Sequence, residues 1–412
     1  MSTENTPKIR FEGFTDAWKQ RKLSEVAEKI CVGFVGTCEK YYTDTSGIPM
    51  YRTGNLNGLK LNQDDLKYVT KEFHEQNKKS QLRKGDILIA RHGDSGKAVN
   101  YELSEEANCL NIVIIRPDLD KCNYQFLSDS INSPTVSQHI KSLSAGSTQA
   151  VINTSEIEKL DIIIPANKEE QNKIAGFLND LDNLITLHQR KCEEIKILKK
   201  SMLQKMFPKE GERFPEIRFP GFTDAWEQRK FDEWGDFYYG HSCPKWSVTE
   251  DATTPCIRYG ELYTKFGAKI DKVYSYTNMP PEKLRFSKGT EVLIPRVGED
   301  PMDYNHCTWL SLKGVAIGEM ISVFNTDQDP LFSATMFNAT LQKEFAIRVE
   351  GGSVTNLYFD KLKNIDISYP SLPEQKKIAA FFDNLDNLIT LHQRKCEELI
   401  EMKKFMLQNM FC

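Results

Sequence analysis

The side chains of this sequence that could do chemistry together are two pairs of histidine and cysteine. His188 and Cys192, and again His392 and Cys396, lie four residues apart, which places each pair on one face of a helix. Two such helices meeting antiparallel could bring the four side chains together as a Cys2His2 zinc site. The alternative is a polar layer that fixes the register of two packed helices. We favour the polar layer and expect the chain to hold no metal.

Motifs of self-sufficient enzymes are missing. The sequence has no G-x-G-x-x-G after a strand, no G-x-S-x-G, no H-E-x-x-H and no Asn-Pro-Pro-aromatic or Asp-Pro-Pro-aromatic motif. GDSGK at 93–97 has the wrong glycine spacing for a P-loop, and PDLDK at 117–121 has the wrong spacing for a nuclease. We therefore predict that the chain has no catalytic residues and is not an enzyme by itself.

The elements that carry the His/Cys pairs are two copies of one repeat. LDNLITLHQRKCEE occurs at 181–194 and again at 385–398. In and around it, mostly apolar residues recur at intervals of four and three residues in turn, which is typical of a helix that packs along another helix. A helix over 169–206 would be about 57 Å long. The predicted seam positions are Ile174, Leu178, Leu181, Ile185, His188 and Cys192 in the first copy, and Ile378, Phe382, Leu385, Ile389, His392 and Cys396 in the second.

A second repeat opens each half of the chain. IRFEGFTDAWKQRK at 9–22 returns as IRFPGFTDAWEQRK at 217–230. Trp18 and Trp226 form either an exposed docking patch or a contact with the base of the helices, and we favour the contact. The basic pairs Arg21/Lys22 and Arg229/Lys230 either meet phosphate or stay solvated.

The segments between the repeats differ in most residues but share a skeleton. YRTGNL (51–56) corresponds to IRYGEL (257–262), KGDILIARHGDSGKAV (84–99) to KGTEVLIPRVGED (288–300), and the stretch 146–165 to 351–370. Short β-branched runs with turn residues predict two mostly-β globular domains, with helices near 124–143 and 331–348.

The predicted organisation is α+β with a pseudo-twofold repeat. It consists of a first domain (1–167), a first spacer helix (168–207), a second domain (208–371) and a second spacer helix (372–412), the two helices forming an antiparallel coiled coil. If the chain ends lie together, the repeat forms a near-closed cycle and tolerates circular permutation.

Composition describes an ordinary soluble protein of 412 residues with a net charge of −4. There is no secretory signal and no apolar run long enough for a membrane, so we expect a cytoplasmic location. Ten cysteines without a C-x-x-C pair indicate reduced thiols. Because segments 31–167 and 241–371 each carry two more acidic than basic residues, DNA binding would need a local basic face.

Two similar domains without a catalytic site suit a target with two parts, such as duplex DNA with two half-sites. Arginine side chains suit guanine, and Asn or Gln suits adenine. Arg52 and Arg258 are common to both halves, so we expect them to bind phosphate or support the fold. The candidate contacts are Arg52, Asn55, Arg91, His92, Lys97, Ser147, Thr148 and Gln149 in the first domain, and Arg258, Tyr259, Glu261, Arg296, Ser353, Thr355 and Asn356 in the second.

Several of these motifs, in this order, resemble the specificity subunit of type I restriction-modification enzymes. The resemblance rests on the F-x-G-F-T-D-A-W-x-x-R-K openings, the R-x-G-x-L and K-G-D-I-L-I-x-R segments, and the I-P that precedes the E-x-Q-x-K-I-A helix of the first half. It implies two target recognition domains that each read half of a split, asymmetric DNA site. It also implies helices that set the spacing and dock modification (methyltransferase) subunits, two of them, together with restriction subunits.

In the same family, S-adenosylmethionine, ATP and Mg²⁺ belong to the partner subunits and not to this chain. The alternative function is a coiled-coil adaptor whose β-domains bind proteins. A self-sufficient nuclease or methyltransferase is disfavoured by the missing motifs.

Overall fold

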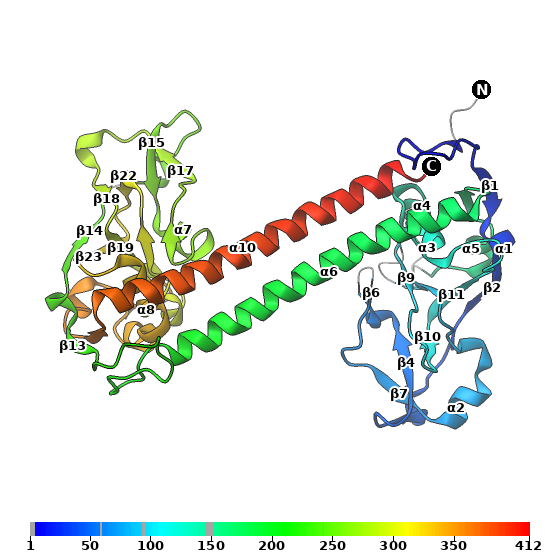
Figure 1. Ribbon diagram of the computed structural model, residues 1–412, viewed down its shortest axis with the longest axis horizontal. Coiled ribbons are helices and arrows are strands. Elements are labelled where there is room, and N and C mark those ends of the chain that lie inside the picture. The colour runs from blue at the N-terminus through cyan, green and yellow to red at the C-terminus, as the bar shows by residue number, and fades with distance from the viewer. Residues whose placement is uncertain (1–4, 58–59, 93–95, 145–150, 242) are drawn as a thin grey trace. The chain divides into compact units, whose positions relative to one another are not determined.

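The computed structural model describes residues 5–57, 60–92, 96–144, 151–241 and 243–412 (Figure 1). It divides into two compact units, and the first is assembled from two distant parts of the chain. Unit 1 comprises Met1–His188 and Arg394–Cys412, and unit 2 comprises Gln189–Gln393. The two long helices, α6 (Lys168–Lys205) and α10 (Leu372–Asn409), each have 38 residues, and each contributes residues to both units. The predicted helices are therefore present, but the compact units do not follow the linear division into four segments.

Unit 1 contains two four-stranded sheets. The first has the order β2-β11-β8-β9, and the second β10-β4-β7-β3. The central strand β11 is IVIIRP, and only its arginine is not fully buried, which suits a strand covered on both faces. The strands are β2 (Ala27–Val32), β11 (Ile112–Pro117), β8 (Ile87–Ala90), β9 (Ala98–Asn100), β10 (Asn108–Leu110), β4 (Ile48–Arg52), β7 (Lys67–Val69) and β3 (Tyr42–Thr43).

Two short two-stranded pairings complete the β-structure of unit 1: β1 (Lys19–Lys22) with β12 (Asp161–Ile164), and β5 (Leu56–Asn57) with β6 (Lys60–Leu61). Helix α3 begins where the Asn123 side chain accepts hydrogen bonds from the first-turn amides of Gln125 and Phe126. The shorter helices are α1 (Leu23–Val26), α2 (Lys71–Gln76), α3 (Tyr124–Asn132), α4 (Pro134–Ser144) and α5 (Thr154–Glu158).

Unit 2 repeats this plan with a larger sheet. Its sheets have the orders β14-β23-β19-β21-β16, β17-β15-β22-β18 and β20-β25-β24, and β13 pairs with β26. The strands are β13 (Glu227–Lys230), β14 (Asp236–Tyr239), β15 (Thr254–Ile257), β16 (Lys269–Ile270), β17 (Ser275–Thr277), β18 (Phe286–Lys288), β19 (Glu291–Pro295), β20 (Val297–Gly298), β21 (Thr308–Leu310), β22 (Lys313–Ile317), β23 (Ile321–Asn325), β24 (Glu350–Gly351), β25 (Thr355–Asn356) and β26 (Asp366–Tyr369). Its shorter helices are α7 (Tyr259–Thr264), α8 (Pro330–Thr340) and α9 (Gln342–Ala346).

The pairing pattern gives the equivalence between the units. In unit 1, β4 pairs with β7 and with β10, while β11 lies between β2 and β8. In unit 2, β15 pairs with β17 and with β22, while β23 lies between β14 and β19. The predicted shared skeleton is therefore a shared strand arrangement, and both globular domains are mostly β with a few helices, as expected.

Helices α6 and α10 pack antiparallel within each unit. In unit 1, Lys403 binds both carboxylate oxygens of Asp182 at 2.7 and 2.6 Å. In unit 2, Lys199 binds Asp386 at 2.5 Å. As residue numbers rise along α6 from Asp182 to Lys199, the partner numbers on α10 fall, which is the antiparallel order. Lys199, which lies where the spacing of four and three residues along α6 would place an apolar side chain, is thus one half of an ion pair that occurs in both units.

The predicted seam positions divide into two groups. The early positions are buried and belong to the core of their own unit, where they contact the globular domain as well as the other helix. The later positions are half-buried except for Cys192, which is buried. The early group is Ile174, Leu178, Leu181, Ile378, Phe382 and Leu385, and the half-buried group is Ile185, His188, Ile389, His392 and Cys396.

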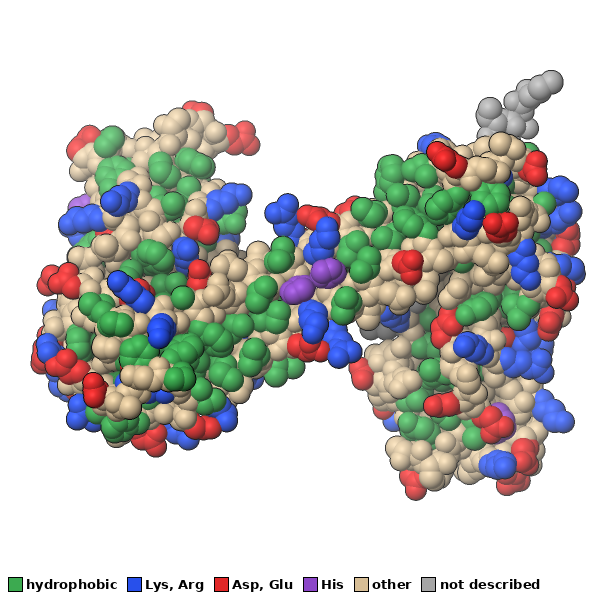
Figure 2. Space-filling model, viewed as in Figure 1, with side chains coloured by type: hydrophobic (Ala, Val, Ile, Leu, Met, Phe, Trp, Pro, Cys, Tyr) green, Lys and Arg blue, Asp and Glu red, His purple; other side chains and the backbone are tan. Residues whose placement is uncertain are grey.

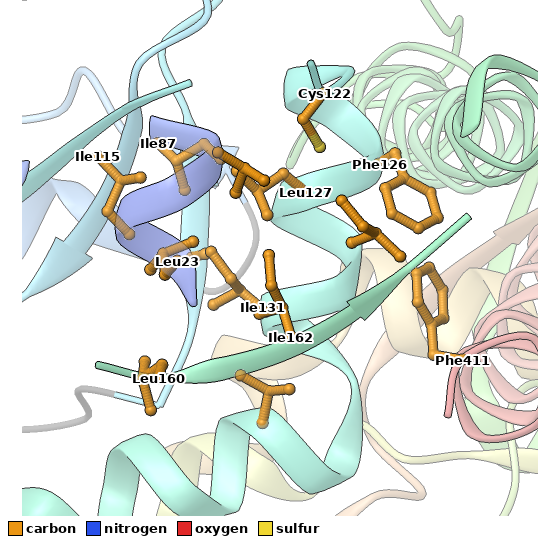
Figure 3. Close-up of a cluster of buried hydrophobic side chains, with 14 of the residues drawn as sticks. Leu23, Ile87, Ile115, Cys122, Phe126, Leu127, Ile131, Leu160, Ile162 and Phe411 are labelled. Atoms are coloured by element: carbon orange, nitrogen blue, oxygen red, sulfur yellow. The ribbon is translucent and has the colours of Figure 1, made fainter. Parts of the chain in front are cut away.

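The opening segments anchor each globular domain to its helix. Arg10 binds Glu170 through Nε and Nη2 at 2.6 and 2.9 Å, and Arg218 binds Glu374 at 2.6 and 2.7 Å. Trp18 is buried, with Phe126 and Phe411 as ring neighbours. Figure 3 shows Phe126 and Phe411 facing each other in this core. Trp226 packs in the same way on Phe207 and Phe332, so the predicted contact at the helix base is confirmed.

The basic pairs that end these segments lie on the exposed strands β1 and β13. Lys22 binds Asp161 at 2.7 Å and Lys230 binds Asp366 at 2.8 Å, in both cases across to the neighbouring strand.

The cycle predicted from the sequence closes. The amide of Ile9 donates to the carbonyl of Asn409 at 2.9 Å, so the last turn of α10 is joined to the opening segment of unit 1 (Figure 1). The equivalent bond in unit 2 runs from the amide of Ile217 to the carbonyl of Lys205, also at 2.9 Å. The same junction therefore occurs twice, once along the continuous chain and once between its two ends.

Among the described residues, no group of three or more His, Cys, Asp or Glu side chains is placed to hold a metal ion, and the zinc arrangement is not formed. All ten cysteines are free thiols, as predicted. No helix in the described part of the chain is long and apolar enough to cross a membrane.

Candidate nucleic-acid interface

Three sequence motifs that are far apart in the chain meet in unit 1 where strand β4 of one sheet and strand β8 of the other end. Strand β4 ends at Arg52, which pairs with Leu110, and β8 ends at Ala90, which pairs with Ile112. Only Asn111 separates these two pairing partners, and its φ of 54° makes the tight turn between β10 and β11. Arg91 follows β8 directly, and its carbonyl accepts the amide of Ile152 at 3.2 Å. We call Arg52, Arg91 and this turn the first arginine edge.

The same edge exists in unit 2. Arg258 follows β15, Arg296 follows β19, and the turn 318–320 joins β22 to β23. The amide of Gly318 donates to Ile257 at 2.9 Å, and the amide of Arg296 donates to Met320 at 3.2 Å. A Cβ atom on Gly318 would lie 2.9 Å from the Ile257 carbonyl oxygen, so the close approach of these strands requires glycine. Arg258, Arg296 and this turn form the second arginine edge.

The residue before the leucine of the R-x-G-x-L motif, Asn55 in unit 1 and Glu261 in unit 2, stabilises the backbone of the arginine edge with its side chain. The Asn55 side chain accepts the amide of Arg52 at 2.9 Å, and the Glu261 side chain accepts the amide of Arg258 at 2.9 Å. Both side chains are buried, and Glu261 also accepts the hydroxyl of Ser275. These are capping interactions. The candidate base contacts at Asn55 and Glu261 are therefore corrected to structural roles.

Thr355 requires the same correction. It is buried in β25, and its hydroxyl donates to the carbonyl of Gly298 at 3.1 Å and lies 2.9 Å from the Tyr304 hydroxyl. Because a buried hydroxyl with its partners in place has no free group to offer, Thr355 is removed from the candidate contacts.

The edge arginines keep unused hydrogen-bonding capacity. Arg52 donates to the carbonyl and carboxylate oxygens of Asp65 at 2.9 and 3.0 Å, while Nε of Arg52, Arg91 and Arg296 is buried and has no acceptor in the part of the chain that the structure describes. Lys67, and to a smaller extent Arg52, lowers the pKa of Asp65. An intramolecular carboxylate thus holds Arg52.

The other candidates are distributed around the two edges. His92 and Lys97 are exposed in unit 1, while Ser353 is exposed, and Tyr259 and Asn356 half-buried, in unit 2. Ser147, Thr148 and Gln149 lie outside the described residues. Figure 2 shows Lys and Arg side chains interspersed with Asp and Glu on the visible face of each unit, so positive charge there is local to small groups of side chains.

Sequence reasoning missed the aromatic surroundings of Arg296. The guanidinium carbon lies 4.7 Å from the ring centre of Tyr239 and 5.2 Å from that of Tyr358. Tyr239 lies outside the shared segments and reaches Arg296 through strand pairing, whereas Tyr358 lies within the shared stretch 351–370 but has asparagine at the equivalent position of the first half. The connecting turns at Asn111 and Gly318 were also missed, because a single Asn or Gly between two apolar runs is a weak signal.

Comparison with known proteins agrees with this architecture. The model of the type I restriction modification DNA specificity domain matches residues 15–197 and 318–401, more than half of the chain. A protein of Methanocaldococcus jannaschii named "Putative type I restriction enzyme MjaX specificity subunit" is 26% identical over 414 residues, covering 97% of this chain and 94% of that protein.

Two solved structures share the fold. The S subunit of a type I restriction-modification system from M. genitalium has a TM-score of 0.60 at 15% identity and covers 99% of both chains. The second structure comes from work on complex assembly and conformational transition of the type I R-M system. It has a TM-score of 0.51 at 16% identity, and the match covers 95% of this chain and 96% of that chain. Repeated domains, antiparallel helices and the family match lead to one conclusion: the chain belongs to the type I restriction-modification DNA specificity family.

Proposed function

We propose that this chain gives a type I restriction-modification complex its specificity for a bipartite, asymmetric DNA site, with each unit reading one half through its arginine edge. The observation that carries the proposal is the repeated edge, where the same three motifs converge in both units while the surrounding residues differ. A shared support with different neighbouring side chains suits two readers of different sequences. The chain itself performs no catalysis in this proposal.

Partner docking is proposed for the exposed leucines of the identical repeat. Leu184 and Leu187 are 43% and 49% exposed, and their copies Leu388 and Leu391 are 42% and 59% exposed. Exposed apolar side chains that recur on a helix face mark a contact surface. Because 181–194 and 385–398 are identical while the globular domains differ, the two surfaces suit two copies of one partner, the modification subunit. Restriction subunits join that assembly, and S-adenosylmethionine, ATP and Mg²⁺ are bound by the partners.

Docking is tested with Leu187→Glu, Leu391→Glu and the double variant, co-purified with the modification subunit. Each single variant should retain one modification subunit per chain, and the double variant should retain none. Charge reversal at the exposed Glu193, in the same repeat, is the control for a general effect of charge. Retention of two subunits by the double variant would contradict the proposed surface.

The function is tested by mapping methylated adenines across the genome of a host that carries the partner subunits, with and without this chain. The expected result is a split motif that is methylated only when the chain is present. A complex that assembles but methylates without any chain-dependent motif would support the adaptor function instead.

The helices are proposed to set the spacing between the two half-sites. Inserting or deleting one helical turn next to Leu181 in α6, with the matching change in α10 next to Lys403, which binds the neighbouring Asp182, should alter the permitted spacer and leave the end bases unchanged. Changed end bases would contradict this role.

A further inference from the structure

The two arginine edges differ in the residues that surround the arginine after β8 in unit 1 and after β19 in unit 2. Pro295 precedes Arg296 and pairs with Ile321, and Ala90 precedes Arg91 and pairs with Ile112. One residue further along β23 and β11, Ser322 pairs with Tyr239, whereas Val113 pairs with Val32. Unit 2 therefore has an aromatic ring where unit 1 has valine.

A second residue beside the arginine also differs between the two units. The amide of Leu357 donates to the Arg296 carbonyl at 2.8 Å, as the amide of Ile152 does to Arg91. The next residue is Tyr358 in unit 2 and Asn153 in unit 1. Arg296 thus has tyrosine at both flanking positions, and the equivalent positions around Arg91 carry valine and asparagine.

On this basis, which rests on the proposed function, we propose that Arg296 is a specificity-determining residue that reads a guanine in the half-site bound by unit 2. Tyr239 and Tyr358 hold the guanidinium, with their ring centres 4.7 and 5.2 Å from its central carbon. Among the described residues, its Nη1 donates only a long hydrogen bond, 3.4 Å to the Glu319 carbonyl, at the exposed surface of the turn. Its Nε is covered. The two terminal nitrogens are the fork that pairs with guanine O6 and N7.

Flanking rings make this arginine a better reader because they fix the side chain before DNA arrives. A free arginine loses much rotamer freedom when it is immobilised, and a planar guanidinium stacked on aromatic rings has already lost it. A fixed plane suits both a guanine edge and a bidentate phosphate, and the variants below separate these two roles by whether one base pair or overall binding is affected. Arg91, without such flanks, is expected to be the less selective of the pair.

The test uses the assembled complex and three variants, with the methylated motif read genome-wide and initial rates measured on oligonucleotides that vary one base pair at a time. Arg296→Ala should relax one guanine position in one half-site, with a loss of discrimination of about 5- to 150-fold. Arg296→Lys should restore it only in part, because a flexible ammonium lacks the planar fork that the two tyrosine rings hold. The double variant Tyr239→Val with Tyr358→Asn, which installs the residues of unit 1, should lose about 2- to 5-fold per ring.

The other half-site, read by unit 1, is the internal control for folding and assembly in every variant, and its bases should not change. A motif unchanged in Arg296→Ala overturns the proposal. A uniform loss of binding that Arg296→Lys restores, with a reduced salt dependence in Arg296→Ala, makes Arg296 a phosphate contact and also overturns it. Failure of the proposed function is distinguishable, because the wild-type complex would then show no split motif.

Discussion

The bidentate pair between Arg10 and Glu170 is expected to hold unit 1 together. The Glu170 side chain is 1% exposed and that of Arg10 11% exposed, so Glu170→Met leaves a nearly buried guanidinium without a counter-charge. Removing one partner of such a pair costs about 3–5 kcal/mol. At about 2–4 °C per kcal/mol for a unit of this size, the melting temperature of unit 1 should fall by about 6–20 °C.

The double variant Arg10→Met/Glu170→Met should recover most of this loss, because two apolar side chains replace both charges together. It still leaves the Trp18 indole N–H, which donates to Glu170 at 3.3 Å, without an acceptor, at a cost of about 1–2 kcal/mol. The expected coupling between the two substitutions is therefore about 2 kcal/mol or more.

Calorimetry of the full-length chain measures these losses, and hydrogen exchange of the β1 amides assigns them to unit 1. Arg218→Met and Glu374→Met are the matched set in unit 2, where the pair has the same geometry and the loss should appear in β13. If the double variant in unit 1 is as unstable as Glu170→Met alone, the ion pair is not what anchors the opening segment.

Three further predictions compare equivalent positions or conditions. Lys403→Met should destabilise its unit by about 2 kcal/mol and Lys199→Met by no more than about 1 kcal/mol. The reason is that the Lys403 side chain is 7% exposed and that of Lys199 is 26% exposed. Equal losses of unfolding free energy in urea would refute a role for burial. Trp18→Phe should cost about 1 kcal/mol more than Trp226→Phe in the same assay, since of the two indole N–H groups only that of Trp18 has an acceptor among the described residues, and an equal cost would refute that contribution. Burial raises the pKa of Asp129 to about 7 against the effect of nearby Lys403, so the folded state binds the proton more tightly and its stability falls as pH rises from about 4 to 7. Asp129→Asn should therefore raise the melting temperature by an amount that grows between pH 4 and pH 8, and a gain independent of pH would contradict this.

The sequence by itself determined the repeated plan. The long helices follow from a local period of residues, and the observed α6 and α10 begin and end within a few residues of the expected positions. The buried role of Trp18 and Trp226 also followed, because an aromatic residue repeated in both halves most often contributes to a core. The absence of catalytic motifs and the order of the shared motifs pointed to the family that the comparisons show.

Only the tertiary structure decided which of the candidate polar residues support the backbone. Asn55 and Glu261 occupy motif positions that looked like contacts, yet they cap the backbone of the neighbouring arginines. Lys199 looked like a flaw in an apolar stripe, and its partner Asp386 lies 187 residues away. The flanks of Arg296 come from strands set by long-range pairing. Periodicity is a property of neighbouring residues, whereas such partners are fixed by strand register and packing between distant segments, which no local pattern records.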